Sequence, residues 1–223
     1  SWGKTEPWKN SKADVVAASR KRSSRYTGLK AQGYSDKGIT KMFDEPVETT
    51  IFTWDGQKDT VLTPNDSLKH HLRFMHTGFF AMEPKTGYVL AWVGGIDHRF
   101  FKYDHVKSKR QVGSTFKPIV YATAIEQGIS PCEYFPNQKI TYDKYGWTPG
   151  NSSGEYGGYY SMMGGLTHSV NTVAAAIIMK TGVQPVIAEA RKMGIKGDLP
   201  QVPSIALGTA SLSLQEMVTA YGC

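Results

Sequence analysis

The order of the apolar segments limits the fold of this chain more than any other feature of its sequence. Two short apolar runs, residues 79–83 and 88–93, flank a Pro84-Lys-Thr-Gly87 turn and predict a β-hairpin. Apolar segments of helical length follow in the second half of the chain. Apolar residues on both strands favour a sheet that helices cover on at least one face. The sequence therefore predicts an α+β fold in which helices pack on an antiparallel sheet.

Further elements are expected on both sides of this hairpin. Turn residues, caps and periodicity give their approximate bounds. The pattern predicts helical structure in residues 11–32 and part of 33–46, a strand in 47–54, a helix from Asn65-Asp66 to Gly78, helices in 114–127, 171–180, 185–193 and 213–221, and a loop in 132–165.

The positive charge of the chain is confined to its first part. The formal net charge is +7 for 223 residues, and residues 1–41 hold ten Lys or Arg against three Asp or Glu. A nucleic-acid surface would more naturally spread over the folded module, so nucleic acid is not expected as a partner. A basic lead-in is more typical of a solvated helix, an interdomain linker or a segment near anionic headgroups.

Several other classes of protein are not expected. No run of about eighteen apolar residues appears, and the polar start shows no signal peptide, so any exporting or anchoring segment is expected outside this chain. Cys132 and Cys223 are too few for a metal cluster or a disulfide framework, and we do not expect them to be bonded to each other. The histidines have no metal-ligand spacing, so neither a metal nor an organic cofactor is predicted.

A serine and a lysine three residues apart are the main candidates for chemistry. They lie in residues 110–118, RQVGSTFKP. The spacing places Ser114 and Lys117 on one face of a first helical turn, where the amine can take the proton of the hydroxyl. The alternative is an ordinary helix start, in which Ser114 is the cap and Lys117 is solvated. A second match, from Ser1 to Lys4, is interpreted as chance.

Five segments in one order closely resemble the transpeptidase domain of bifunctional, class A penicillin-binding proteins. Besides RQVGSTFKP they are TGYVLAWVGG, the Trp147-Thr-Pro149…Asn151 loop, the triplet Ser169-Val-Asn171, and ALGTASLSLQEMVTAY. The resemblance covers residues 66–223 and implies the fold that penicillin-binding proteins share with serine β-lactamases. Residues 1–65 resemble the segment that joins the glycosyltransferase domain to the transpeptidase, so a basic interdomain linker region with a β segment is expected there.

The resemblance implies a role for each motif residue. Ser114 matches the nucleophile, Gly113 beside it is expected to help bind substrate, and Lys117 matches the base. An amine acts as a base at neutral pH only if burial or nearby cations depress its pKa. Ser169 would relay a proton between Lys117 and the leaving or entering amine, and Asn171 would hydrogen-bond the substrate amide. Taken alone, Ser169 or Asn171 could simply cap the next helix.

The third family motif, K-[ST]-G, departs from its expected place. It should lie on a sheet strand well after S-x-N, yet the K-T-G of this chain, Lys180-Thr-Gly182, closely follows Asn171 at the end of an apolar helical run. We interpret it as a helix C-terminus. The true motif, further strands and a final helix are therefore expected to be missing, which predicts a fold incomplete at its C-terminus and a fragment that could be inactive alone.

The function that this resemblance implies is peptidoglycan D,D-transpeptidation. The reaction would pass through a serine acyl-enzyme formed from D-Ala-D-Ala stem peptides, and penicillin would acylate the same serine. The implied partners are stem peptides, β-lactam antibiotics and cell-wall synthesis proteins. The parent protein would also be a peptidoglycan glycosyltransferase, held at the outer side of the cytoplasmic membrane by a segment not present here.

Two alternative functions remain open at this point. A serine β-lactamase would share Ser114 and Lys117 but hydrolyse its acyl-enzyme quickly, and the linker-like residues 1–65 argue against it. A non-catalytic, transpeptidase-like module would bind cell wall or partner proteins. The intact set of motif residues argues against this second alternative for the parent protein, whereas the missing third motif leaves it open for this chain.

Overall fold

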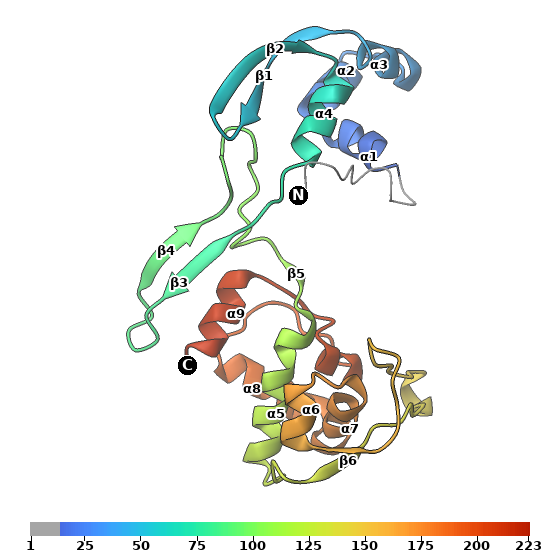
Figure 1. Cartoon of the computed structure of the whole chain (residues 1–223), viewed down its shortest axis with the longest axis vertical. Coiled ribbons are helices and arrows are strands. Elements are labelled where there is room, and N and C mark those ends of the chain that lie inside the picture. The colour runs from blue at the N-terminus through green and yellow to red at the C-terminus, as the bar shows by residue number, and fades with distance from the viewer. Residues whose placement is uncertain (1–13) are drawn as a thin grey trace. The chain divides into compact units, whose positions relative to one another are not determined.

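The computed structural model describes residues 14–223 (Figure 1). The chain divides into two compact units, which are described separately below. The first unit extends to His76 and includes Asp97–Lys102, and the second comprises Thr77–Ile96 and Tyr103–Cys223.

The first unit consists of short helices and one hairpin. A side-chain cap at Ser23 divides the helical segment expected in residues 11–32, because Ser23 Oγ accepts a hydrogen bond from the backbone N–H of Tyr26. The predicted strand is present, and residues after its turn form a second strand that the sequence analysis did not predict. The elements are α1 (Val15–Arg22), α2 (Ser24–Ala31), α3 (Asp36–Met42), β1 (Val47–Thr53), β2 (Gly56–Leu62) and α4 (Pro64–Leu72).

The second unit begins with the predicted apolar hairpin. Strands β3 (Phe79–Met82) and β4 (Val89–Val93) pair antiparallel, with Phe80 opposite Trp92. Helix α9 (Leu214–Tyr221), at the end of the chain, packs against β3. The α+β class is therefore confirmed, although each sheet among the described residues has only two strands.

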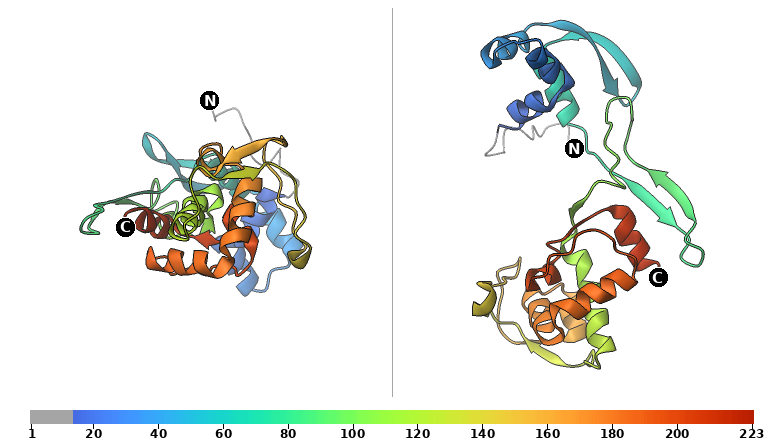
Figure 2. Two further views of the ribbon diagram at one scale, coloured as in Figure 1. Left: turned by 90° about the horizontal axis from the view of Figure 1, so that it is seen from below. Right: turned by 180° about the vertical axis from the view of Figure 1, so that it is seen from behind.

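The core of the second unit is helical and centres on one buried helix. Helix α7 (Asn171–Thr181) contacts α5 (Lys117–Glu126), α6 (Met162–Thr167), α8 (Val183–Lys192) and the 3-10 helix η4 (Pro203–Leu207), as Figure 2 helps to follow. Its residues are apolar on almost every side, as expected for a helix surrounded by others. The side chains of α7 that are buried are those of Thr172, Val173, Ala174, Ala175, Ile177, Ile178 and Thr181.

Helices α5 and α7 lie parallel and in matched register. At one end, the Lys117 amine donates to Asn171 Oδ1 at 2.7 Å. At the other end, Gln127 Nε2 donates to Thr181 O at 3.2 Å. Both hydrogen bonds join residues 54 positions apart, so the two helices run side by side from their first turns to their last. The N-termini of both helices therefore lie at one end of the core.

Residues 128–170 form the long connection between these two helices. The sequence analysis predicted a loop for 132–165, and this is wrong in part. The segment contains the strand pair β6 (Tyr134–Pro136) and β7 (Tyr159–Ser161), the 3-10 helix η3 (Asp143–Tyr145) and helix α6. The strand pair and α6 are held by contacts with distant residues, which local periodicity does not reveal.

Among the described residues, no single helix combines the length and the apolar composition needed to cross a membrane. Helices α7 and α8 reach the necessary length and apolar composition only when they are taken together, and they are bent by 95° relative to each other.

Candidate active site

Ser114 lies in an exposed 3-10 turn that leads directly into α5. The turn is η2 (Gly113–Phe116), and Gly113 opens it with a φ of 57°. The N-cap of α5 is Phe116, which offers no capping side chain, so the alternative in which Ser114 caps this helix is wrong. Within the described residues the Ser114 hydroxyl makes no hydrogen bond. It is therefore open to a ligand.

A short β-ladder from the end of the chain holds this turn in place. Strand β5 (Arg110–Gln111) pairs with β8 (Ser211–Leu212), and the pairing continues as Val112 N–H donates to Ala210 O at 3.1 Å. Gly113 N–H then donates to Gly208 O at 3.0 Å. A Cβ atom at Gly208 would lie 1.8 Å from the Gly113 carbonyl oxygen, so only glycine fits there.

Lys117 is buried and reaches the second motif. Its side chain is 1% exposed, and its Nζ donates to Ser169 O at 2.6 Å and to Ser169 Oγ at 3.0 Å. A third hydrogen bond runs to Asn171 Oδ1. Burial lowers the pKa of Lys117 from its ordinary value of 10.5 to about 8, because a dry environment disfavours the ammonium ion. Of the two causes that the sequence analysis considered, burial is the one that acts.

The three partners of Lys117 differ in what they can do when the amine is neutral. A neutral amine has two N–H groups and one lone pair. The Ser169 carbonyl oxygen can only accept a hydrogen bond. The atom of Asn171 that faces the amine is also an acceptor, Oδ1, because the amide Nδ2 of Asn171 donates to Gly150 O at 2.8 Å. The Ser169 hydroxyl is then the one partner that can donate to the lone pair. This arrangement can pass a proton between Lys117 and Ser169.

Ser169 lies on the turn directly before α7, and Asn171 is the first residue of that helix. Ser169 has a φ of 53°, and it is the one non-glycine residue with positive φ among the described residues. Helix α7 starts at Asn171, and its N-cap is Val170. The alternative that Ser169 or Asn171 caps this helix is therefore wrong. The capping oxygen is Asn151 Oδ1, which accepts from Asn171 N–H at 3.0 Å.

The structure thus brings together Lys117, Ser169 and Asn171 and places Ser114 one turn before the lysine. Two further residues, Gly208 and Asn151, hold this arrangement, and the sequence patterns predicted no role for either. Both lie inside segments that were recognised only by resemblance. In the sequence, Gly208 stands out only as a glycine among apolar residues, and Asn151 only as an asparagine two positions after a proline. Neither feature indicates which residue would be the contact partner.

A polar cavity of about 380 Å³ adjoins the Ser169 turn. It is lined by Asn137, Asn151, Ser152, Ser153, Glu155, Tyr160, His168, Ser169 and Val170. In the part of the chain that the structure describes, no group of three or more His, Cys, Asp or Glu side chains could hold a metal ion. Cys132 and Cys223 are both free and exposed.

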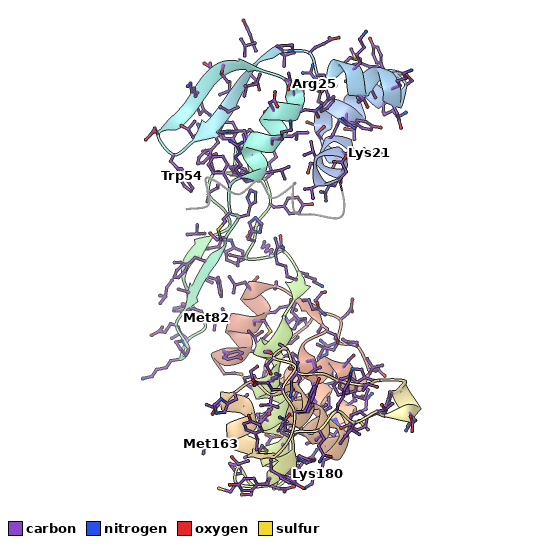
Figure 3. The ribbon with its side chains drawn as sticks, turned by 45° about the vertical axis from the view of Figure 1, so that its right-hand side comes forward. Lys21, Arg25, Trp54, Met82, Met163 and Lys180 are labelled. Atoms are coloured by element: carbon purple, nitrogen blue, oxygen red, sulfur yellow. The ribbon has the colours of Figure 1, made fainter. Side chains whose placement is uncertain are left out.

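The K-T-G segment is confirmed as a helix end. Lys180 occupies the last turn of α7, where it forms an ion pair with Glu133, and its side chain can be found in Figure 3. Gly182 ends the helix with φ 86° and ψ 153°. Its ψ is extended, so Gly182 lies outside the left-handed helical region, but the positive φ still favours glycine.

Comparison with known proteins agrees with this geometry. The model of the penicillin-binding protein transpeptidase domain matches residues 77–216, and the model of the penicillin-binding protein middle domain matches residues 3–75. Penicillin-binding protein 2D of Bacillus subtilis is 35% identical over 155 residues, which are 66% of this chain and 22% of that protein. Penicillin-binding protein 1A of Neisseria gonorrhoeae is 36% identical over 148 residues, which are 63% of this chain and 18% of that protein.

A solved structure supports the same assignment. The crystal structure of penicillin-binding protein 1A from Haemophilus influenzae aligns with a TM-score of 0.63 and 30% identity, and it covers 66% of this chain and 23% of that one. The chain thus spans about a fifth of the length of the curated relatives that it matches. The motif order, the helical core and these matches together confirm the resemblance. The chain belongs to the transpeptidase family of penicillin-binding proteins.

Proposed function

We propose that the protein carrying this chain is a serine D,D-transpeptidase that cross-links peptidoglycan and is acylated by β-lactams. The observation that supports this most is the buried Lys117 amine, which hydrogen-bonds Ser169 and Asn171 and lies one turn after an unpaired Ser114 hydroxyl. Family membership supports the reaction class, and the motif residues support the mechanism below.

In the proposed acylation step, the Ser114 hydroxyl attacks the carbonyl carbon of the D-Ala-D-Ala amide. Neutral Lys117 takes the hydroxyl proton once its lone pair turns from the Ser169 hydroxyl to Ser114, and the negative charge moves to the carbonyl oxygen. Gly113 N–H is already bonded to Gly208 O, so it cannot bind that oxygen unless the ladder opens. Among residues 14–223, the Ser114 N–H has no backbone partner outside its own turn, so it is the better donor. We therefore assign Gly113 the shaping of the turn.

In the second half of this step, the tetrahedral intermediate collapses and the C–N bond breaks. The departing amine needs a proton, which the Ser169 hydroxyl supplies while it receives one from the Lys117 ammonium. The reverse transfer removes a proton from the entering amine when the acyl group moves to the neighbouring stem. Asn171 would hydrogen-bond the substrate amide, although its Oδ1 and Nδ2 atoms already have partners in this structure.

The setting of the reaction is part of the proposal. We propose that the parent protein also has peptidoglycan glycosyltransferase activity and acts on the outer side of the cytoplasmic membrane. Residues 1–65 stay predicted as the basic interdomain linker region, and 66–223 as the N-terminal part of the transpeptidase domain.

The test is covalent labelling of the full-length protein with penicillin. Intact-mass and peptide-mapping spectrometry should find one adduct, on Ser114, and Ser114→Ala should abolish it without changing the melting temperature. An adduct on another residue, or none, would refute the proposal. The lifetime of the acyl-enzyme separates a transpeptidase, which keeps the adduct, from a β-lactamase, which hydrolyses it quickly.

A further inference from the structure

Helix α7 begins without a capping side chain of its own. Its N-cap residue, Val170, has no side-chain acceptor for the first N–H groups. The backbone N–H groups of Asn171 and Thr172 donate instead to Asn151 Oδ1, at 3.0 and 3.2 Å. Asn151 lies 20 residues before Asn171, in the loop after Pro149. A distant side chain therefore replaces the usual local cap.

The NH₂ group of the Asn151 amide fixes the orientation of this side chain. Its Nδ2 donates to Asn137 Oδ1 at 2.7 Å and to Glu155 O at 2.9 Å. Asn137 is buried, and its Oδ1 also accepts from Thr172 Oγ1 at 2.8 Å. A rotated Asn151 amide would point its NH₂ group at two N–H donors, so only one orientation satisfies all these groups.

The turn that Asn151 holds carries all the hydrogen-bond partners of the Lys117 amine among the described residues. Ser169 has positive φ, and such a backbone persists only where the surroundings hold it. Its carbonyl and hydroxyl oxygens, with Asn171 Oδ1, surround Lys117 Nζ. The loop of Asn151 also holds the Asn171 side chain, because Gly150 O accepts a hydrogen bond from Asn171 Nδ2. The loop therefore fixes both the backbone and the side chain at the start of α7.

We infer that Asn151 is a positioning residue for acyl transfer, which acts by holding the turn from Ser169 to Asn171 against Lys117. The inference rests on the proposed function and adds a residue that does not touch the reacting atoms. Without the Asn151 side chain, two N–H groups lose their acceptor and the strained turn relaxes. Water then reaches the amine, and a hydrated ammonium ion has a higher pKa.

A purely structural cap would behave differently. It would lower the stability of the fold and leave the ionisation of Lys117 unchanged. The matched control is Ser213→Ala, which removes the capping box of α9 in the same unit, where Ser213 Oγ accepts from Glu216 N–H. Ser213 has no hydrogen bond to Lys117 or to the Ser169 turn. Ser213→Ala therefore reports the loss of a cap that does not contact Lys117 or the Ser169 turn.

The first measurement is the titration of the Lys117 ¹³Cε resonance in the full-length protein, assigned with Lys117→Arg. Wild type and Ser213→Ala should titrate at the same pH, and Asn151→Ala should titrate roughly half a unit higher or more. An unchanged or lower pKa in Asn151→Ala would overturn the inference. If Asn151→Ala does not fold, Asn137→Ala removes the side chain that orients Asn151 and should shift the pKa in the same direction.

The second measurement is the rate of Ser114 acylation by penicillin on its high-pH plateau, where Lys117 is neutral in every variant. Asn151→Asp keeps the oxygen that accepts from Asn171 and Thr172 but turns its second oxygen toward the acceptors Asn137 Oδ1 and Glu155 O, so its plateau rate should fall less than that of Asn151→Ala. Asn151→Ala should fall about tenfold or more, because misplaced groups slow a reaction steeply. Equal rates in both variants would overturn the inference. A wild type without acylation refutes the proposed function, while the Lys117 titration still tests Asn151.

Discussion

The rate of Ser114 acylation should follow the ionisation of Lys117. The lysine pKa of about 8 leaves about a tenth of the molecules neutral at pH 7, whereas an ordinary pKa of 10.5 would leave about three in ten thousand. Burial thus raises the fraction of competent base about 300-fold, which is the ratio that 2.5 pKa units give. The acylation rate should therefore rise about ninefold from pH 6 to pH 7 and about fivefold from pH 7 to pH 8, and it should level off above about pH 9.

The assay is quenched-flow acylation of the full-length protein by a penicillin, with intact-mass detection from pH 5.5 to pH 10. Lys117→Arg is the matched variant, because a guanidinium group stays protonated across this range. Its rate should be about a hundredfold lower or more and should not rise with pH through 8. A wild-type profile that is flat between pH 6 and pH 8, or one that still rises steeply at pH 10, would refute the role assigned to the buried amine.

The same pKa shift predicts how stability depends on pH. The pKa of Lys117 is lower in the folded state than in the unfolded state, so between about pH 8 and pH 10.5 the unfolded state binds more protons. The free energy of unfolding should therefore rise with pH across this window. The contribution of this residue is on the order of 3 kcal/mol, from 1.36 kcal/mol for each pKa unit. Comparison of wild type with Lys117→Met removes the contributions of the other titrating groups.

Three substitutions test the packing around the site. Gly208→Ala should cost about 2 kcal/mol or more and slow acylation at Ser114, because its Cβ would lie 1.8 Å from Gly113 O; thermal melts and labelling measure both effects. Gly165→Ala should cost roughly 1–3 kcal/mol in thermal melts, since its Cβ would lie 2.5 Å from Val173 Cγ1, and an unchanged melting temperature would contradict that close approach. Lys180→Ala should cost less than about 1 kcal/mol and leave the acylation rate unchanged, because its ion pair is partly exposed; a hundredfold loss of rate would restore the K-T-G segment as a catalytic motif.

Sequence patterns predicted those elements that are determined by residues close together in the chain. The hairpin of β3 and β4 follows from two apolar runs and a four-residue turn. The end of α7 follows from Lys180 and Gly182, which are typical of a helix C-terminus. In each case the deciding residues lie within a few positions of one another.

Contacts between distant segments could not be predicted in this way. The ladder from Gly208 to Gly113 joins residues far apart in the chain, and nothing near either glycine indicates the other. The cap from Asn151 to Asn171 is of the same kind, and so is the strand pairing of β6 with β7. Resemblance to the family marked these segments as important, but it supplied no physical reason. The reason appears only when the hydrogen-bond partners are known.

The parallel register of α5 and α7 explains why the site lies where it does. Lys117 and Asn171 are the first residues of the two helices, so packing the helices side by side brings these residues together. Burial between the helices then lowers the pKa of this amine. A neutral lysine and a strained Ser169 both work against stability, and the apolar contacts of α7 along its whole length offset them. The helical core is therefore what keeps an otherwise unfavourable group of side chains in position.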